Sequence, residues 1–240
     1  MRIGLLKLMI QSQILQQLAM MQLADSFFPT GSFTLSHGLE SLVQTGKVQS
    51  VQELQVFLQL LLHNRVGTTD LVALLHSHRG INDGNLEAAR QADRQLFAQT
   101  AIAKIRETQR QSGRALLMVS SSTWQDKRLE ILNREAATGT IHCLHPVIFG
   151  AVAAIAELSE QNTVLAFLHS LVASILSAAI RLGILGHIHT QQILRSLAPD
   201  IEAVWSNAKS MNLEQMWSCT FFIDIAQMQH PKLPQRLFAN

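Results

Sequence analysis

The sequence predicts an all-α fold: one single-domain helical bundle of about ten helices that spans residues 1–240. Three observations lead to this class. Apolar residues recur with the 3.6-residue period of a helix along most of the chain. Alternating runs rich in Val, Ile and Thr, which are typical of strands, do not occur. Hydrophobic residues make up 48% of the chain and charged residues 15%, so a large core or a partner interface must cover the apolar surface.

The first three predicted helices begin and end at recognisable signals. The first covers residues 12–24, and only chain starts before Ser12 leave it whole. The second covers residues 35–45, with Gly46 as its C-terminal stop. The third covers residues 51–65 and starts at a capping box, since Ser50 and Glu53 have the S-x-x-E spacing in which each side chain bonds the other residue's backbone N–H.

The same periodicity continues toward the C-terminus and is interrupted by short polar or glycine-containing breaks. We expect these breaks at residues 82–85, 139, 161–163 and 199–200. The helices that they separate are predicted at residues 69–79, 86–100, 101–119, 146–158, 164–182 and 190–197.

Charge is distributed unevenly over these helices. Between Arg134 and Arg181 there is no Lys or Arg, which predicts helices buried on all sides at the centre of the bundle. Residues 164–180 are also near the lower length limit for a membrane span, but His169 and three serines interrupt them, so a buried helix is favoured over a membrane-associated protein. Residues 87–135 hold nine basic and six acidic side chains, which indicates a solvated face.

The composition also narrows the compartment and the partners. A formal net charge of +2 without a basic block argues against nucleic acid as the main partner. Two cysteines, Cys143 and Cys219, cannot staple a chain of this size, and we expect both to be small buried hydrophobes, with reactive thiols as the alternative. The N-terminal apolar stretch contains Lys7 and no cleavage site follows it, so no signal peptide is predicted and a cytoplasmic location is expected.

One connection, at residues 23–40, has an unusual composition. It contains three of the ten phenylalanines together with Pro29, Gly31 and Gly38. Pro29 fixes its own φ, and the two glycines allow backbone angles or close approaches that other residues resist. Two interpretations stay open: a helix-helix corner filled by aromatic side chains, or a shaped functional surface.

The connection reads Leu-Ala-Asp-Ser, then Phe-Pro-Thr-Gly-Ser-Phe, then Ser-His-Gly-Leu-Glu. These residues resemble the N-terminal signature of the UreF family of urease accessory proteins. Further family-like motifs follow in order at residues 112–117, 145–150, 181–187, 192–194 and 236–238, so the resemblance covers nearly the whole chain. The chain departs from the family pattern at Leu35, Ile184, His187 and Pro231.

The resemblance implies a non-catalytic adaptor for nickel insertion. Its partners would be UreD (also called UreH), the GTPase UreG and apo-urease, and the chain would form a homodimer, with no nucleic acid and no membrane involved. Nickel would be handled by the complex, with no cofactor bound tightly and no metal site in this chain. A tail at residues 229–240 would become ordered on a partner. The implied partner-binding residues are Pro29, Gly31, Phe33, Ser36, Gly38, Glu40, Arg181 and Arg236.

The residues themselves offer little chemistry for catalysis. There is no phosphate-binding G-x-x-x-x-G-K-[ST] loop, no G-x-S-x-G elbow and no H-E-x-x-H motif. The histidine pairs at residues 76 and 78 and at residues 187 and 189 have poor spacing for one helix face. Residues 142 and 145 could share a face only if both were helical, and Pro146 at a helix start argues against that. A histidine-based metal-binding enzyme remains the alternative function. Arg181 either caps its helix C-terminus, with Gly183 as the stop, or contacts the GTPase partner.

Overall fold

The computed structural model describes the backbone of residues 2–29 and 34–239, and the side chains of residues 13–29 and 34–239. Every regular element in these ranges is a helix, which confirms the all-α class. The α-helices are α1 (Arg2–Ala24), α2 (Leu39–Gln44), α3 (Val51–Leu61), α4 (Leu71–Asn82), α5 (Leu86–Gln99), α6 (Ala103–Thr123), α7 (Lys127–Thr138), α8 (His145–Ile155), α9 (Glu160–Arg181), α10 (His187–Ser196), α11 (Ala198–Ala208) and α12 (Phe221–Gln229). A π-helix η2 (Leu62–Asp70) and two short 3-10 turns, η3 (Leu213–Gln215) and η4 (His230–Lys232), complete the order.

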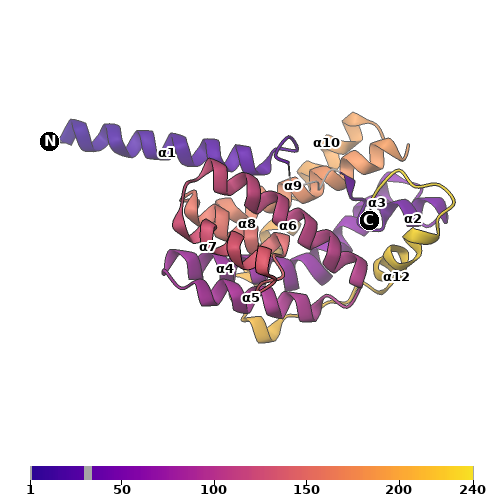
Figure 1. The fold of residues 1–240 in the computed structure, drawn as a ribbon. Coiled ribbons are helices and arrows are strands. Elements are labelled where there is room, and N and C mark those ends of the chain that lie inside the picture. The colour runs from indigo at the N-terminus through magenta and orange to yellow at the C-terminus, as the bar shows by residue number, and fades with distance from the viewer. Residues whose placement is uncertain (1, 30–33, 240) are drawn as a thin grey trace.

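Helices α4 and α8 form the centre of the molecule (Figure 1). All residues of α8 from Pro146 to Ala154 are buried, as are nine of the twelve residues of α4. The two helices touch through their backbones at Gly150, where an added Cβ would collide with the carbonyl of Leu74. The predicted central buried helix is therefore confirmed for α8, and glycine at residue 150 is what lets the two axes come this close.

Helix α9 is the second apolar helix of the core. It is long and apolar enough to cross a membrane by length and composition, but 61% of its most apolar window is buried inside the fold. A core helix of a globular protein has these same properties. The break predicted at residues 161–163 is wrong, because Ser159 accepts a hydrogen bond from the N–H of Asn162 and so caps a helix that begins at Glu160.

Helix α1 packs against α9 through its C-terminal half, and its N-terminal half extends away from the other helices (Figure 1). Ala19 and Leu23 are buried at the contact. On the outer side the exposed apolar side chains are Ile14, Leu15, Leu18 and Met21. The helix is longer than the predicted residues 12–24.

The helices predicted at residues 51–65 and 69–79 are one continuous helical segment in the structure. Helices α3 and α4 are joined without interruption by η2, whose wider turns free some carbonyls for other partners. The carbonyl of Asn64 accepts the N–H of Cys219 at 2.9 Å, and the Thr68 hydroxyl bonds the carbonyl of Trp217 at 2.5 Å. Contacts from a segment about 150 residues later in the chain thus hold this helix together, and no local pattern announces them.

Other boundaries follow local signals. The capping box of Ser50 and Glu53 is present as predicted, and Gly46 and Gly139 take left-handed angles at the predicted stops. Helix α2 begins at Leu39 instead of residue 35, because the two residues before it have positive φ. Three helices were not predicted at all: α7, α11 and α12.

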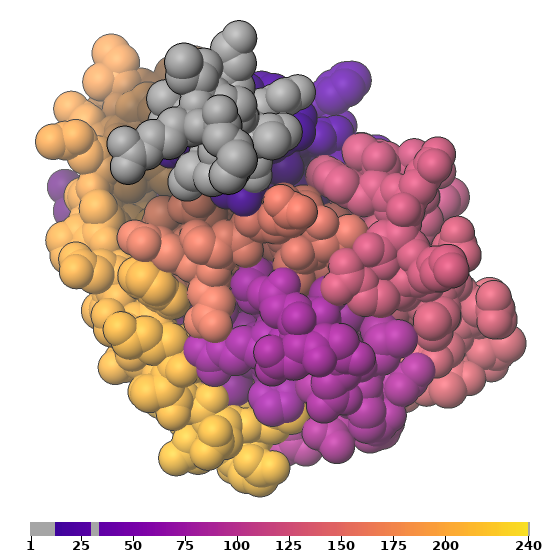
Figure 2. Space-filling model, turned by 90° about the vertical axis from the view of Figure 1, so that its left-hand side faces the viewer, coloured from indigo at the N-terminus to yellow at the C-terminus, as the bar shows by residue number. Residues whose placement is uncertain are grey.

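The charged segment at residues 87–135 forms α5, α6 and α7, and many of its side chains are exposed as predicted. In the view of Figure 2, the helices of the middle of the chain cover one flank in pink, and the C-terminal third covers the opposite flank in orange to yellow. The C-terminus lies beside α2 and α3 (Figure 1). The connection at residues 23–40 and the C-terminal tail, which both contain family-like motifs, therefore come into contact.

Candidate partner-binding site

The connection between α1 and α2 combines both interpretations of its composition. Phe28 is 6% exposed and its ring stacks 6.4 Å from that of Trp124, so it fills a corner between helices. Phe27 is 91% exposed, and Pro29 is exposed beside it. Two of the predicted site residues, Gly31 and Phe33, lie outside the described residues.

The end of this connection is shaped by close contact with α12. His37 and Gly38 have φ angles of 53° and 89°. The side-chain amide of Gln227 donates to the carbonyl of His37 at 3.2 Å. A Cβ on Gly38 would stand 3.0 Å from Cγ of Gln227 and 3.2 Å from the carbonyl oxygen of Ile223. Glycine is thus required both by the left-handed angle and by the approach of α12.

Glu40 joins this connection to the C-terminal tail. Its carboxylate is fully buried, and Oε2 lies 2.7 Å from Nε2 of His230. The other oxygen, Oε1, accepts the backbone N–H of Leu237 at 2.6 Å. The backbone N–H of Glu40 in turn donates to the hydroxyl of Ser36 at 3.3 Å. Because a buried carboxylate is costly unless it is bonded, these contacts fix residues 230–237 against α2.

Arg181 contacts the C-terminal tail through Phe238. It is the last residue of α9, where a cation favours the helix dipole, and its guanidinium carbon lies 4.2 Å from the centre of the Phe238 ring. Phe238 is 6% exposed. Partial burial lowers the pKa of Arg181, and the nearby charge of Glu40 opposes that change. Both roles foreseen for Arg181, at the helix end and at a contact surface, are compatible with this position.

The tail makes two more backbone contacts with the early part of the chain. The N–H of Ala239 donates to the carbonyl of Thr34 at 2.9 Å, and the side chain of Gln44 donates to the carbonyl of Gln235 at 2.9 Å. Arg236 is exposed between them. Ordering of the tail by a partner stays a prediction.

Four of the predicted residues therefore lie in one contact network with the tail: Ser36, Gly38, Glu40 and Arg181. Sequence reasoning missed three members of that network, namely Gln227, His230 and Phe238. The only signal for Phe238 was the Arg-Leu-Phe motif, in which it is the phenylalanine that is buried and the arginine that faces solvent.

A cavity of about 80 Å³ lies next to this network, between η2, α6, α8 and α9. His37 and His145 are among its lining residues, and burial lowers the pKa of each to about 4. Both imidazoles are therefore neutral at pH 7. Burial also raises the pKa of Asp70, whose carboxylate accepts a hydrogen bond from Gln109 at 3.2 Å.

The histidines do not assemble into a recognisable metal centre. Across residues 13–29 and 34–239, no three His, Cys, Asp or Glu side chains lie close enough together to hold a metal ion. His78 bonds the carbonyl of Leu158 at 2.8 Å, and His142 lies against the ring of Phe97 at 3.6 Å. His145 begins α8 with Pro146 directly after it, as the sequence suggested.

The two cysteines differ. Cys143 is buried as predicted, and burial raises the pKa of its thiol to about 12. Cys219 is exposed, so the expectation of burial is wrong there. It lies in the irregular segment before α12, whose position depends on the η2 carbonyls and not on any local apolar pattern.

Comparison with known proteins gives a consistent result. The UreF family model matches residues 48–198. A urease accessory protein UreF from Trichodesmium erythraeum (strain IMS101) is 72% identical over 232 residues, which cover 97% of this chain and 100% of that protein. A urease accessory protein UreF from Rhodopseudomonas palustris (strain BisB18) is 31% identical over 218 residues, covering 89% of this chain and 87% of that protein. A urease accessory protein UreF from Corynebacterium efficiens is 26% identical over 229 residues, which cover 95% of this chain and 99% of that protein.

Proposed function

Because this chain belongs to the UreF family of urease accessory proteins, we propose that it is a non-catalytic adaptor that joins UreD and the GTPase UreG to apo-urease. In this role it couples GTP hydrolysis by UreG to the incorporation of nickel into urease. Nickel is the cargo of the whole complex, and this chain holds no tightly bound cofactor. We further propose that it works in the cytoplasm as a homodimer.

The contact between Glu40 and the C-terminal tail is the observation that carries this proposal. It brings together two segments that resemble family motifs, at residues 23–40 and 236–238, although they lie at opposite ends of the chain. Arg181, from a third such motif, covers Phe238 of the same tail. Three family-like segments meet in space here, and their described residues hold no catalytic arrangement, which fits a surface for protein contacts better than an active site.

The burial of the predicted partner-binding residues separates those that position the surface from those that a partner would contact. Ser36 and Glu40 are 0% exposed, so they act by positioning the connection and the tail. Pro29, Arg181 and Arg236 are exposed and are available for direct contact with a partner. Gly38 belongs with the positioning group because its role is to admit α12. We propose that the predicted Gly31 and Phe33 complete the contact surface.

Reconstitution with purified components tests this function. Apo-urease, UreD, UreG, nickel and GTP are combined with or without this chain, and urease activity is followed over time. We expect activation only when both the chain and GTP are present. Activation that is equal without the chain would contradict the adaptor role. Nickel that stays bound to the isolated chain in a stoichiometric amount after dialysis would instead favour the histidine-based metal-binding alternative.

A further inference from the structure

A row of three arginines follows one side of α6. Arg106, Arg110 and Arg114 are spaced by four residues, so their side chains leave the helix in the same direction and span about 12 Å along it. They face the loop that leads into α8. Burial lowers the pKa of His142 in that loop. The negative charge of Asp93 raises this pKa in part, and the positive charges of Arg110 and Arg106 lower it again.

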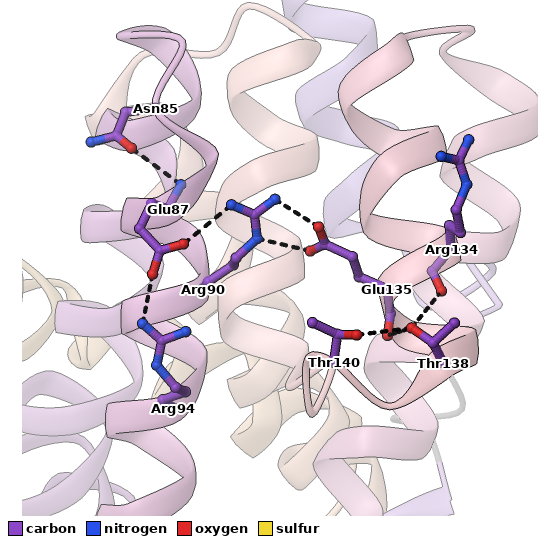
Figure 3. Close-up of polar contacts among 8 residues, drawn as sticks. All are labelled: Asn85, Glu87, Arg90, Arg94, Arg134, Glu135, Thr138 and Thr140. Atoms are coloured by element: carbon purple, nitrogen blue, oxygen red, sulfur yellow. Dashed lines mark hydrogen bonds and ion pairs between the residues drawn. The ribbon is translucent and has the colours of Figure 1, made fainter.

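The acidic side chains around this row are largely engaged elsewhere. Glu87 and Glu135 both bind Arg90, and Glu87 also binds Arg94 at 2.7 Å (Figure 3). Asp93 is 1% exposed, and its carboxylate accepts the backbone N–H groups of His142 and Leu144 at 2.5 and 2.9 Å. Glu87, Glu135 and Asp93 therefore have bonding partners other than the three arginines of the row.

One acidic residue of α6, Glu107, lies near the arginine row. Glu107 approaches Arg110 only to 3.8 Å, at which distance an exposed pair contributes little. The Nε of Arg110 has no acceptor among the described residues. Arg114 is exposed and makes no hydrogen bond or ion pair with any side chain or backbone group in residues 13–29 and 34–239. Arg106 donates to the carbonyl of Thr100, a neutral acceptor, at 3.0 Å.

We propose that Arg106, Arg110 and Arg114 form a docking stripe for an acidic segment of a partner protein. A guanidinium binds a carboxylate through two parallel N–H donors, so carboxylates repeated at about one helical turn would match the three positions. This surface is separate from the tail network, and the proposal does not depend on the assignment of an adaptor role.

Nucleic acid fits this stripe less well. Stacking of bases needs an open aromatic face, and the nearby Phe97 ring is covered by His142 at 3.6 Å and approached by the guanidinium of Arg106 at 4.9 Å. Three arginines on a chain of net charge +2 also give a short track for a phosphate backbone.

The test compares two variants of the full chain with equal charge change. The stripe variant is Arg106→Gln with Arg110→Gln and Arg114→Gln. The control variant is Arg94→Gln with Lys127→Gln and Arg134→Gln; Arg134 points away from the Glu135 network in Figure 3. Fluorescence anisotropy measures binding of a labelled hexaglutamate peptide and of a labelled oligothymidylate of six nucleotides. Circular dichroism confirms that both variants keep their helicity.

We expect the wild-type chain to bind hexaglutamate, the stripe variant to lose about tenfold or more in affinity, and the control variant to stay within about twofold. Binding should also weaken as salt is raised. No binding by the wild-type chain, or an equal loss in both variants, would overturn the proposal. Tighter binding of the oligothymidylate that is lost only in the stripe variant would overturn it in favour of nucleic acid.

Discussion

The Glu40 carboxylate and the His230 imidazole lie 2.7 Å apart, with both side chains almost completely removed from solvent. One residue belongs to the second helix and the other to the start of the tail, so this contact fixes the C-terminus on the early part of the chain. The same carboxylate accepts the N–H of Leu237. Loss of either partner leaves a buried polar group without its bond, which is more costly than the bond itself is stabilising.

Replacement of His230 by Ala should release the tail. The variant leaves one carboxylate oxygen of Glu40 unsatisfied, and we expect amide hydrogen exchange at Leu237 to speed up by about tenfold or more. Lys232→Ala is the control, since Lys232 is exposed in the same segment. Unchanged exchange at Leu237 in His230→Ala would show that the tail is held without this contact.

The cation above Phe238 should contribute separately to the tail. Arg181→Gln removes the charge over the ring, and we expect a loss of about 1 kcal/mol in the free energy of tail opening, measured by exchange at Ala239. Arg181→Lys keeps a cation and should retain part of this energy. Equal behaviour of the two variants would indicate that packing of the side-chain stem, not its charge, matters here.

Gly150 should be irreplaceable at the contact of α4 and α8. Gly150→Ala places a methyl group against the carbonyl of Leu74, and we expect a loss of about 3 kcal/mol or more in the free energy of unfolding, measured with urea. Gly186→Ala is the matched control, because a Cβ there meets nothing within 4 Å. A similar midpoint for both variants would mean that α4 and α8 separate at little cost.

Acid should destabilise the fold partly through His145. Its pKa is about 4 in the folded chain, because of burial, and about 6.5 when exposed. As pH falls from 6.5 to 4, the unfolded chain takes up this proton and the folded chain does not, so stability falls by about 1.4 kcal/mol per pH unit for this group. Above pH 6.5 the residue has no such effect.

Urea titrations of the wild-type chain and of His145→Leu at several pH values check this. The free energy of unfolding of the wild-type chain, taken relative to that of His145→Leu, should fall from pH 6.5 toward pH 4. The buried Asp70 and Asp93 act in the opposite direction, since their raised pKa values make the folded chain bind protons more readily, but they are present in both proteins. A constant difference would show that His145 titrates normally in the folded chain.

Local signals in the sequence predicted much of the helical framework. Ser50 with Glu53, Gly46 and Gly139 marked real ends because capping and left-handed stops depend on neighbouring residues alone. The continuity through η2 could not be foreseen, since its backbone groups are satisfied by Trp217 and Cys219.

The candidate site was predicted unevenly for the same reason. Glu40 and Arg181 stood out through family-like motifs, but their partners His230 and Phe238 are defined only by how the tail folds back. Within the tail motif, exposure separates Arg236 from Phe238, and sequence patterning over three residues is too short to tell which side faces the core.

Complex formation shows whether the connection, Arg181 and the tail form one surface for partners in urease maturation. The chain is mixed with UreD and UreG and analysed by size exclusion, alongside Arg181→Ala, Arg236→Ala and the distant control Arg134→Ala. We expect a ternary complex with the wild-type chain and the control, and weakened complexes with the other two at unchanged helicity. Full complex formation by both Arg181→Ala and Arg236→Ala would show that these residues do not belong to the partner surface.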